Sequence, residues 1–100
     1  MMTTPMNEAA IVERLQKLDG WERDGGTITK TFKVDTYLAG LALATAIGTV
    51  CEGLDHHPDM MIGWRKVTVS FTTHDAGSQL SDKDFAAAEK VEALGYPRKS

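Results

Sequence analysis

Two stretches of the chain, residues 27–34 and residues 65–73, alternate apolar and polar side chains with a period of two. The apolar positions that share one face of each extended stretch are Ile28, Phe32 and Val34, and then Val67, Val69 and Phe71. The opposite face of both stretches carries mainly Thr, Ser and Lys. Alternation of this kind is typical of antiparallel strands that bury one face on a core. It therefore restricts the possible folds more strongly than any other feature.

Each of these long strands is preceded by a shorter one. Asp24-Gly25-Gly26 is a turn signal, so residues 21–34 are predicted to form a β-hairpin. Residues 60–64 are predicted to form a short strand before the second long one. The sequence thus predicts four strands in two consecutive pairs.

The first helix is predicted near residues 5–18. Thr4 is its expected N-cap, Pro5 takes the first helical position, and Gly20 ends the run. The apolar residues that recur at helical spacing in this segment are Ile11, Leu15 and Leu18.

A second helix is predicted to begin after Asp35 or Thr36, either of which can cap it. Pro58 disfavours helical geometry at His57, so this helix stops at or just before the His56-His57 pair. The positions predicted to share its apolar face are Leu43, Ile47, Val50 and Leu54.

A third helix is predicted to open at Ser81, which forms a capping box with Asp84, and to end at Gly95. Its apolar positions are Phe85, Ala88, Val91 and Leu94. The element order is then α-β-β-α-β-β-α. Residues 1–100 are therefore predicted to form a single α+β domain, a four-stranded antiparallel sheet with three helices packed on one face.

The charge and cysteine content exclude several classes of partner. The net charge of -3 and the pI of about 5.5 give no attraction for nucleic acid or an anionic membrane. The most apolar segment, residues 37–51, is too short to span a bilayer, and residues 1–8 do not resemble a secretory signal. Cys51 is the only cysteine, so no internal disulfide is possible. We therefore expect a cytoplasmic protein.

All three histidines fall between Glu52 and His74. His56 and His57 lie at a predicted helix-to-strand junction, and His74 lies at the end of a predicted strand. Histidine gives and takes protons near neutral pH. A cluster at the ends of elements, away from the apolar face, is suited to a cleft.

Several other interpretations of these residues remain open. A histidine at a helix C-terminus can simply cap the last carbonyls, which would explain one of the adjacent pair but not all three. Three histidines and a carboxylate could also bind zinc, although adjacent histidines in extended backbone point to opposite sides and the H-E-x-x-H pattern is absent. Cys51 is interpreted as a small buried residue, and Trp21 and Trp64 as core or interface residues.

The stretch from Glu52 to Pro58 resembles the signature of the pterin-4a-carbinolamine dehydratases. That signature has an acidic or polar residue, three residues, His-His-Pro, an aromatic after a short gap, nine residues, a histidine and a later aspartate. In this chain Trp64, His74 and Asp84 occupy the last three positions. The Thr72-Thr73-His74-Asp75 and Leu80-Ser81 segments are also similar to the family. Two departures are a longer loop at residues 75–79, with Gln79 in place of a glycine, and Met60-Met61 in place of an aromatic pair.

The resemblance implies an enzyme that dehydrates 4a-hydroxytetrahydropterin in tetrahydropterin recycling, without a metal or cofactor. The residues that it implies as catalytic are His56, His57, His74 and Glu52. Those that it implies as substrate-binding are Asp55, His56, His57, Thr72, Thr73, His74, Asp75 and Trp64. It further implies that His57 and His74 transfer protons, that His56 contacts the pterin, and that Glu52 orients a histidine or favours its charged form.

The family also offers alternatives to this function. Some members are binding or assembly modules, including a dimerisation cofactor of a homeodomain transcription factor and RuBisCO assembly factors with degraded active sites. A pterin-related role in molybdopterin metabolism is another possibility. The complete histidine set favours retained catalysis. A homodimer or homotetramer is expected from the family, with a small pterin as substrate and neither nucleic acid nor membrane as partner.

Overall fold

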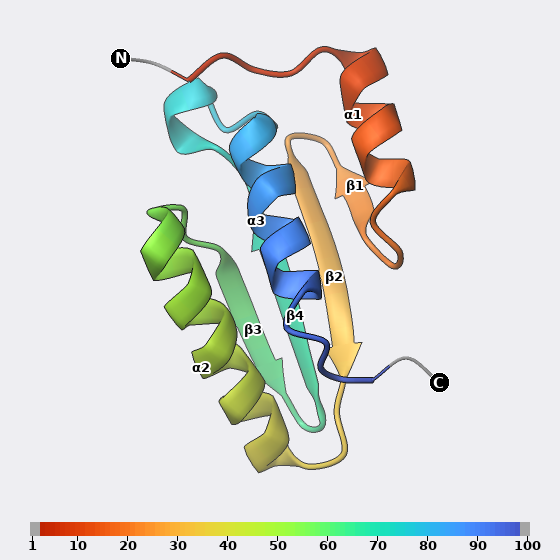
Figure 1. The fold of residues 1–100 in the computed structure, drawn as a ribbon, viewed down its shortest axis with the longest axis vertical. Helices are drawn as coiled ribbons and strands as arrows, with labels where there is room; N and C mark the ends of the chain where they lie inside the picture. The colour runs from red at the N-terminus through yellow and green to blue at the C-terminus, as the bar shows by residue number, and fades with distance from the viewer. Residues whose placement is uncertain (1–2, 99–100) are drawn as a thin grey trace.

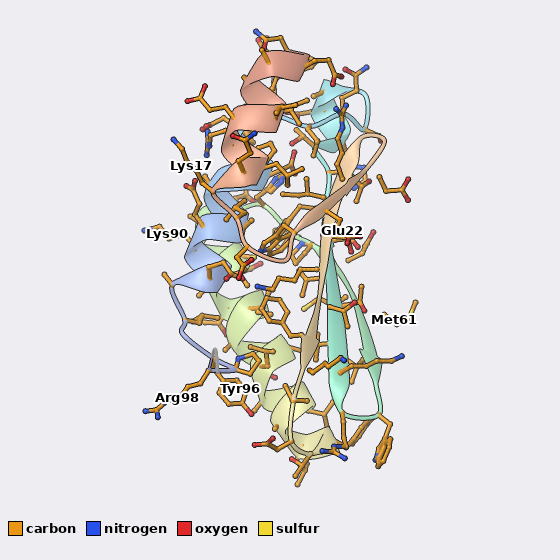
Figure 2. All side chains as sticks on the ribbon, turned by 90° about the vertical axis from the view of Figure 1, so that its right-hand side faces the viewer. Lys17, Glu22, Met61, Lys90, Tyr96 and Arg98 are labelled. Atoms are coloured by element: carbon orange, nitrogen blue, oxygen red, sulfur yellow. The ribbon has the colours of Figure 1, made fainter. Side chains whose placement is uncertain are left out.

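The computed structural model describes residues 3–98, and its elements follow the predicted order (Figure 1). The helices are α1 (Glu8–Gln16), α2 (Tyr37–Leu54) and α3 (Asp82–Glu92), and the strands are β1 (Glu22–Asp24), β2 (Thr27–Lys33), β3 (Asp59–Gly63) and β4 (Lys66–Phe71). The sheet is antiparallel throughout, in the order β1-β2-β4-β3. All three helices lie on one side of it (Figures 1 and 2). The predicted α+β class is confirmed.

The sheet buries the face that the alternation predicted. Ile28 on β2 lies opposite Phe71 on β4, and Phe32 lies opposite Val67. These four side chains are almost fully buried, and the burial of each contributes roughly 1.5–3 kcal/mol to stability. The outer face carries hydroxyl pairs instead, such as Thr31 with Thr68 on the neighbouring strand. The core therefore lies between this sheet and the helices.

The first helix starts later than predicted. Its N-cap is Asn7, whose side-chain oxygen accepts a hydrogen bond from the backbone N–H of Ala10 at 2.9 Å. The backbone N–H of Met6 donates instead to the carbonyl of Leu80 at 2.9 Å. Because this tertiary bond holds the preceding residues outside the helix, the prediction of Thr4 as N-cap is wrong.

Helix α2 begins and ends where the sequence indicated. Thr36 is the N-cap, and its hydroxyl accepts from the backbone N–H of Ala39. The C-cap is Asp55, which adopts the left-handed conformation (φ 53°). The buried face differs from the predicted one, because Val50 is only partly buried and Leu54 is exposed. The residues that α2 buries are Gly40, Leu43, Ala44, Ile47 and Cys51.

Small side chains on α2 explain this rotation of its buried face. A Cβ on Gly40 would lie 3.4 Å from a methyl of Val67 and 3.5 Å from one of Val34, so the glycine lets the helix approach the sheet closely. Burial raises the pKa of the Cys51 thiol, as expected for a small core residue. By length and composition α2 could also cross a membrane, but its buried positions belong to the core of this domain.

Helix α3 carries the predicted capping box. The Ser81 side chain accepts a backbone N–H of the first turn, and the Asp84 side chain accepts the backbone N–H of Ser81. The helix ends at Glu92, before Gly95. Its buried apolar residues are Phe85, Ala87, Ala88 and Val91. The first turn of α3 is thereby fixed against the end of β4, which matters for the site.

Candidate active site

An open cleft of about 470 Å³ lies where α2 ends and β4 ends. Its lining consists of residues 55–59, residues 72–75 and Lys83. All three histidines therefore border one cavity, together with the predicted Asp55 and the Thr72 to Asp75 segment. Glu52 does not line the cleft and instead contacts one of its histidines.

The left-handed turn at Asp55 directs the chain from α2 into the cleft. The backbone N–H of His56 donates to the Cys51 carbonyl at 3.2 Å, which closes the helix C-terminus. The His56 ring then stacks on Phe71, with centroids 5.9 Å apart and an angle of 9° between the planes. The His56 side chain is only 12% exposed, so its ring is held in one orientation.

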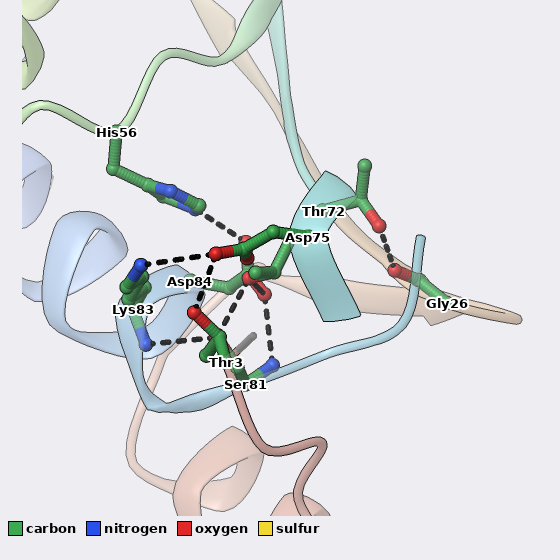
Figure 3. Close-up of polar contacts among 9 residues, drawn as sticks. Thr3, Gly26, His56, Thr72, Asp75, Ser81, Lys83 and Asp84 are labelled. Carbon is green, nitrogen blue, oxygen red and sulfur yellow. Dashed lines mark hydrogen bonds and ion pairs between the residues drawn. The ribbon is translucent and has the colours of Figure 1, made fainter. Parts of the chain in front are cut away.

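The buried carboxylate of Asp84 fixes the other edge of the His56 ring (Figure 3). His56 Nε2 lies 2.7 Å from Asp84 Oδ1, and the Asp84 side chain is 0% exposed. Its second oxygen accepts from the Thr73 hydroxyl at 2.7 Å and from the Ser81 backbone N–H at 2.9 Å. A buried carboxylate requires such a set of donors. The network therefore joins the end of α2, the end of β4 and the start of α3.

His57 has a carboxylate partner of a different kind. Its Nε2 lies 2.6 Å from Glu52 Oε1, one turn earlier on α2, and both side chains are more than half exposed. An N–H on Nε2 donates to this carboxylate, which leaves the lone pair of a neutral ring on Nδ1. The site therefore has two histidine–carboxylate pairs, one buried and one in contact with solvent.

His74 begins the 3-10 turn His74–Ala76 and is exposed. Within residues 3–98 its side chain makes no hydrogen bond or ion pair with another residue, so its ring nitrogens are open to a ligand. The neighbouring Thr72 hydroxyl donates to the Gly26 carbonyl at 2.6 Å. This bond ties the end of β4 to the β1–β2 turn.

A second polar group lies on the cleft rim (Figure 3). Asp75 Oδ2 accepts from the Thr3 hydroxyl at 2.9 Å and lies 3.8 Å from Lys83 Nζ. The Thr3 hydroxyl, and to a smaller extent the Lys83 ammonium, lower the pKa of the Asp75 carboxyl. Asp75 thus presents an ionised carboxylate beside an ammonium, a combination that can hydrogen-bond a polar heterocycle.

The structure does not bring Trp64 to the cleft. Trp64 lies in the β3–β4 turn and is 75% exposed, whereas the cleft is at the opposite ends of these strands. Its indole contacts the Arg65 guanidinium instead. Sequence reasoning also missed Lys83, which carries no signal of its own, and it gave Asp84 a capping role on the third helix but none at the site. The Ser81–Asp84 spacing and the family signature were the available signals for Asp84.

No group of three His, Cys, Asp or Glu side chains within residues 3–98 is arranged as a metal-ligand set. The two carboxylates nearest the histidines each contact only one ring. Around an open cavity the site has two histidines oriented by carboxylates, His56 and His57, a third histidine without such a partner among the described residues, His74, and several hydrogen-bonding groups. Those groups are suited to transferring protons to and from a bound heterocycle.

The contact of the cleft rim with the β1–β2 turn requires glycine at position 26. A Cβ there would lie 2.1 Å from the Ser78 carbonyl oxygen. We expect Gly26→Ala to lower the free energy of unfolding by roughly 1–3 kcal/mol in urea titrations, since the loop must shift. The matched control is Gly53→Ala on α2, where a Cβ meets nothing within 4 Å. Because alanine favours the helix more than glycine does, this substitution should raise the free energy of unfolding by at most about 1 kcal/mol. Equal effects of the two substitutions would contradict this account.

Comparisons with known proteins identify relatives of this chain. The family model described as "Pterin 4 alpha carbinolamine dehydratase" matches residues 4–94. The chain is 43% identical over 93 residues to a Roseiflexus sp. (strain RS-1) protein named "Putative pterin-4-alpha-carbinolamine dehydratase", covering 93% of this chain and 99% of that protein. A Streptomyces coelicolor protein of the same name is 34% identical over 94 residues, covering 94% of this chain and 93% of the relative.

Two solved structures resemble the fold. The crystal structure of a "transcriptional coactivator/pterin dehydratase" from Brucella melitensis superposes with a TM-score of 0.84 at 27% identity, covering 91% of this chain and 98% of that one. A pterin dehydratase-like RuBisCO assembly factor of the α-carboxysome superposes with a TM-score of 0.61 at 21% identity, covering 76% and 87%, and this likeness shows the fold alone. The chain therefore belongs to the pterin-4a-carbinolamine dehydratase family of hydro-lyases, which act in pterin recycling.

Proposed function

We propose that this chain converts 4a-hydroxytetrahydropterin to quinonoid dihydropterin by histidine acid/base catalysis. The observation that carries the proposal is the convergence of His56, His57 and His74 on one cleft of about 470 Å³. A cavity of this size can enclose most of a bicyclic heterocycle. The family membership supplies the substrate class.

The reaction needs two proton transfers. A base removes the proton on N5 of the substrate, and the N5 lone pair forms the N5=C4a double bond. An acid protonates the C4a hydroxyl as the C4a–O bond breaks, so the group leaves as water. No electron acceptor is required, because the elimination is neutral in redox terms.

We assign the two transfers to His57 and His74. His57 is oriented by Glu52 through Nε2, which keeps Nδ1 available, and His74 is exposed and makes no bond to the described residues. One acts as base and the other as acid. His56 is buried against Phe71 and Asp84 and is suited to contacting and positioning the pterin.

The hydrogen-bonding groups for the pterin ring come from the rim. Asp55, Thr72 and Asp75 supply backbone and side-chain groups, and Lys83 adds a cation. The buried Thr73 hydroxyl donates to Asp84, and the Thr73 backbone N–H and carbonyl are bonded within residues 73–79, so Thr73 acts by holding Asp84 in place. Trp64 has no part in this proposal.

The direct test is to mix the protein with freshly generated 4a-hydroxytetrahydropterin and to follow quinonoid dihydropterin by absorbance. We expect acceleration over the spontaneous reaction, and the same rate after treatment with EDTA. Absence of acceleration would refute the dehydratase and would favour a binding or assembly role. A rate lost to EDTA and restored by zinc would refute the metal-free mechanism.

We also propose that the protein is a homodimer or homotetramer. Large apolar side chains outside the core support this, among them Leu38 on α2 and Met61 on β3, which are both mostly exposed. Sedimentation velocity should then give a mass that is two or four times that of the chain. A monomer across the assay concentration range would contradict it.

A further inference from the structure

The second half of β2 has no strand beside it on one edge. β1 pairs only with residues 27–29 of β2, which continues to Lys33. The Val34 N–H donates to the Arg65 carbonyl on the β4 side. Because backbone groups alternate along an antiparallel strand, those of Thr31 and Lys33 point to the open edge. No backbone hydrogen bond from another part of residues 3–98 reaches them.

Three hollows lie around the Lys33 end of β2. The first, of about 350 Å³, lies between β2 and residues 95–98, the second has the same volume beside Val34, and the third, of about 270 Å³, lies beside Trp64. Lys33 lines all three. We call this surface the basic groove and define it by Lys33, Trp64, Arg65, Lys66, Tyr96 and Arg98. Figure 2 looks onto this side of the molecule and shows Tyr96 and Arg98 at its lower end.

Positive charge is concentrated in the basic groove although the whole chain is acidic. Lys33, Arg65, Lys66 and Arg98 form no ion pair within residues 3–98, where the ion pairs use other cations. Lys33 and Lys66 lie directly opposite each other across the β2–β4 ladder, and like charges at such positions destabilise a sheet. Asp35 is the only unpaired carboxylate among the described residues that line the groove. An anionic partner would relieve this repulsion.

The groove also offers apolar contact. Trp64 is 75% exposed, and Tyr96 is exposed at the other end. An open strand edge with an aromatic ring beside it, that of Tyr96, matches the way in which extended peptides bind by adding a strand. Main-chain hydrogen bonds then supply affinity, and alternate side chains supply specificity.

We propose that the basic groove binds an extended acidic segment of a partner protein, which adds to the sheet beside Thr31 and Lys33. Carboxylates of the segment meet Lys33 and Arg98, while alternate apolar side chains contact Tyr96. A second copy of this chain is a poorer occupant, because edge-to-edge pairing at Lys33 would bring lysines of both copies together. The groove lies at the end of the sheet opposite the histidine cleft, so a bound partner leaves the cleft open.

The test uses a fluorescein-labelled nine-residue peptide that alternates Glu and Val. Anisotropy should show saturable binding at about 50 mM salt and at least about tenfold weaker binding at 500 mM, because exposed charges are screened. Hydrogen exchange should slow at the amides of Thr31 and Lys33 when the peptide is bound. A peptide that alternates Lys and Val should not bind, and neither should the Glu-Val peptide with its three central residues replaced by proline, since successive prolines leave no N–H to donate in either register.

Charge reversal locates the site. K33E and R98E should each weaken binding by at least about fivefold, whereas K90E, which reverses an exposed lysine on α3 outside the groove, should bind as the wild type does. All three variants should keep the circular dichroism and dehydratase rate of the wild type. Binding by K33E and R98E as tight as that of the wild type, binding of the proline-substituted peptide, or no binding at millimolar peptide would overturn the proposal. Amide protection that rises with protein concentration alone would assign the edge to a second copy and would overturn it as well.

Discussion

His74→Ala should lower the rate of dehydration by about 10²–10⁴-fold near neutral pH, the usual contribution of a general acid or base. His57→Ala should lower it by a similar factor. Both side chains are exposed, and His74 makes no bond to the described residues, so the losses should occur without loss of stability. The measurements are single-turnover absorbance for the rate and thermal unfolding for the fold.

Two further variants make the interpretation of these rates specific. Glu52→Gln should lower the rate less than His57→Ala does, because the amide can still accept a hydrogen bond from the ring but lacks the charge. Lys90→Ala, on an exposed part of α3, should change neither rate nor stability. A His74→Ala variant with the rate of the wild type would remove His74 from the mechanism.

Asp84→Ala should be the most destabilising single substitution at the site, with a loss of about 3 kcal/mol or more in the free energy of unfolding. The change removes an acceptor that three buried or half-buried groups share: the His56 ring, the Thr73 hydroxyl and the Ser81 N–H. It should also lower the dehydration rate in the fraction that remains folded, because the His56 ring is released. Urea titrations and rates normalised to folded protein separate the two effects.

The neighbouring Asp82 provides a matched control on the same turn of α3. Its carboxylate is exposed and pairs with Arg14 on the surface. Asp82→Ala should therefore lower the free energy of unfolding by no more than about 1 kcal/mol and leave the dehydration rate unchanged. The loss in the free energy of unfolding for Asp84→Asn should lie between the losses for Asp84→Ala and Asp82→Ala, since asparagine keeps the volume of the side chain and one acceptor oxygen. A loss at Asp82 as large as that at Asp84 would contradict the role of the buried network.

The strands, their pairing and the end of α2 could be predicted because each depends on local chemistry. The alternation at residues 27–34 predicts a strand with one buried face, and the glycines of Asp24-Gly25-Gly26 predict the turn before it. Pro58 disfavours helical geometry at the residue before it, so the end of α2 can be predicted from adjacent residues alone. The same local rules put His56 and His57 at the helix end and His74 after β4.

The errors come from contacts between distant residues. The Met6 N–H bonds to the Leu80 carbonyl, so the helix starts after the signal at Thr4 and Pro5. Trp64 is close to the histidines along the chain, yet the length of β3 separates it from the cleft. Lys83 reaches the rim only because α3 packs against the end of β4, which no local pattern predicts.

Every residue that lines the cleft, together with the two carboxylates that hold its histidines, comes from the stretch between Glu52 and Asp84. The segment before α1 and the β1–β2 hairpin reach the cleft only at its rim, through Thr3 and Gly26. During evolution, substitutions outside residues 52–84 can therefore change surface contacts without replacing any residue of the cleft.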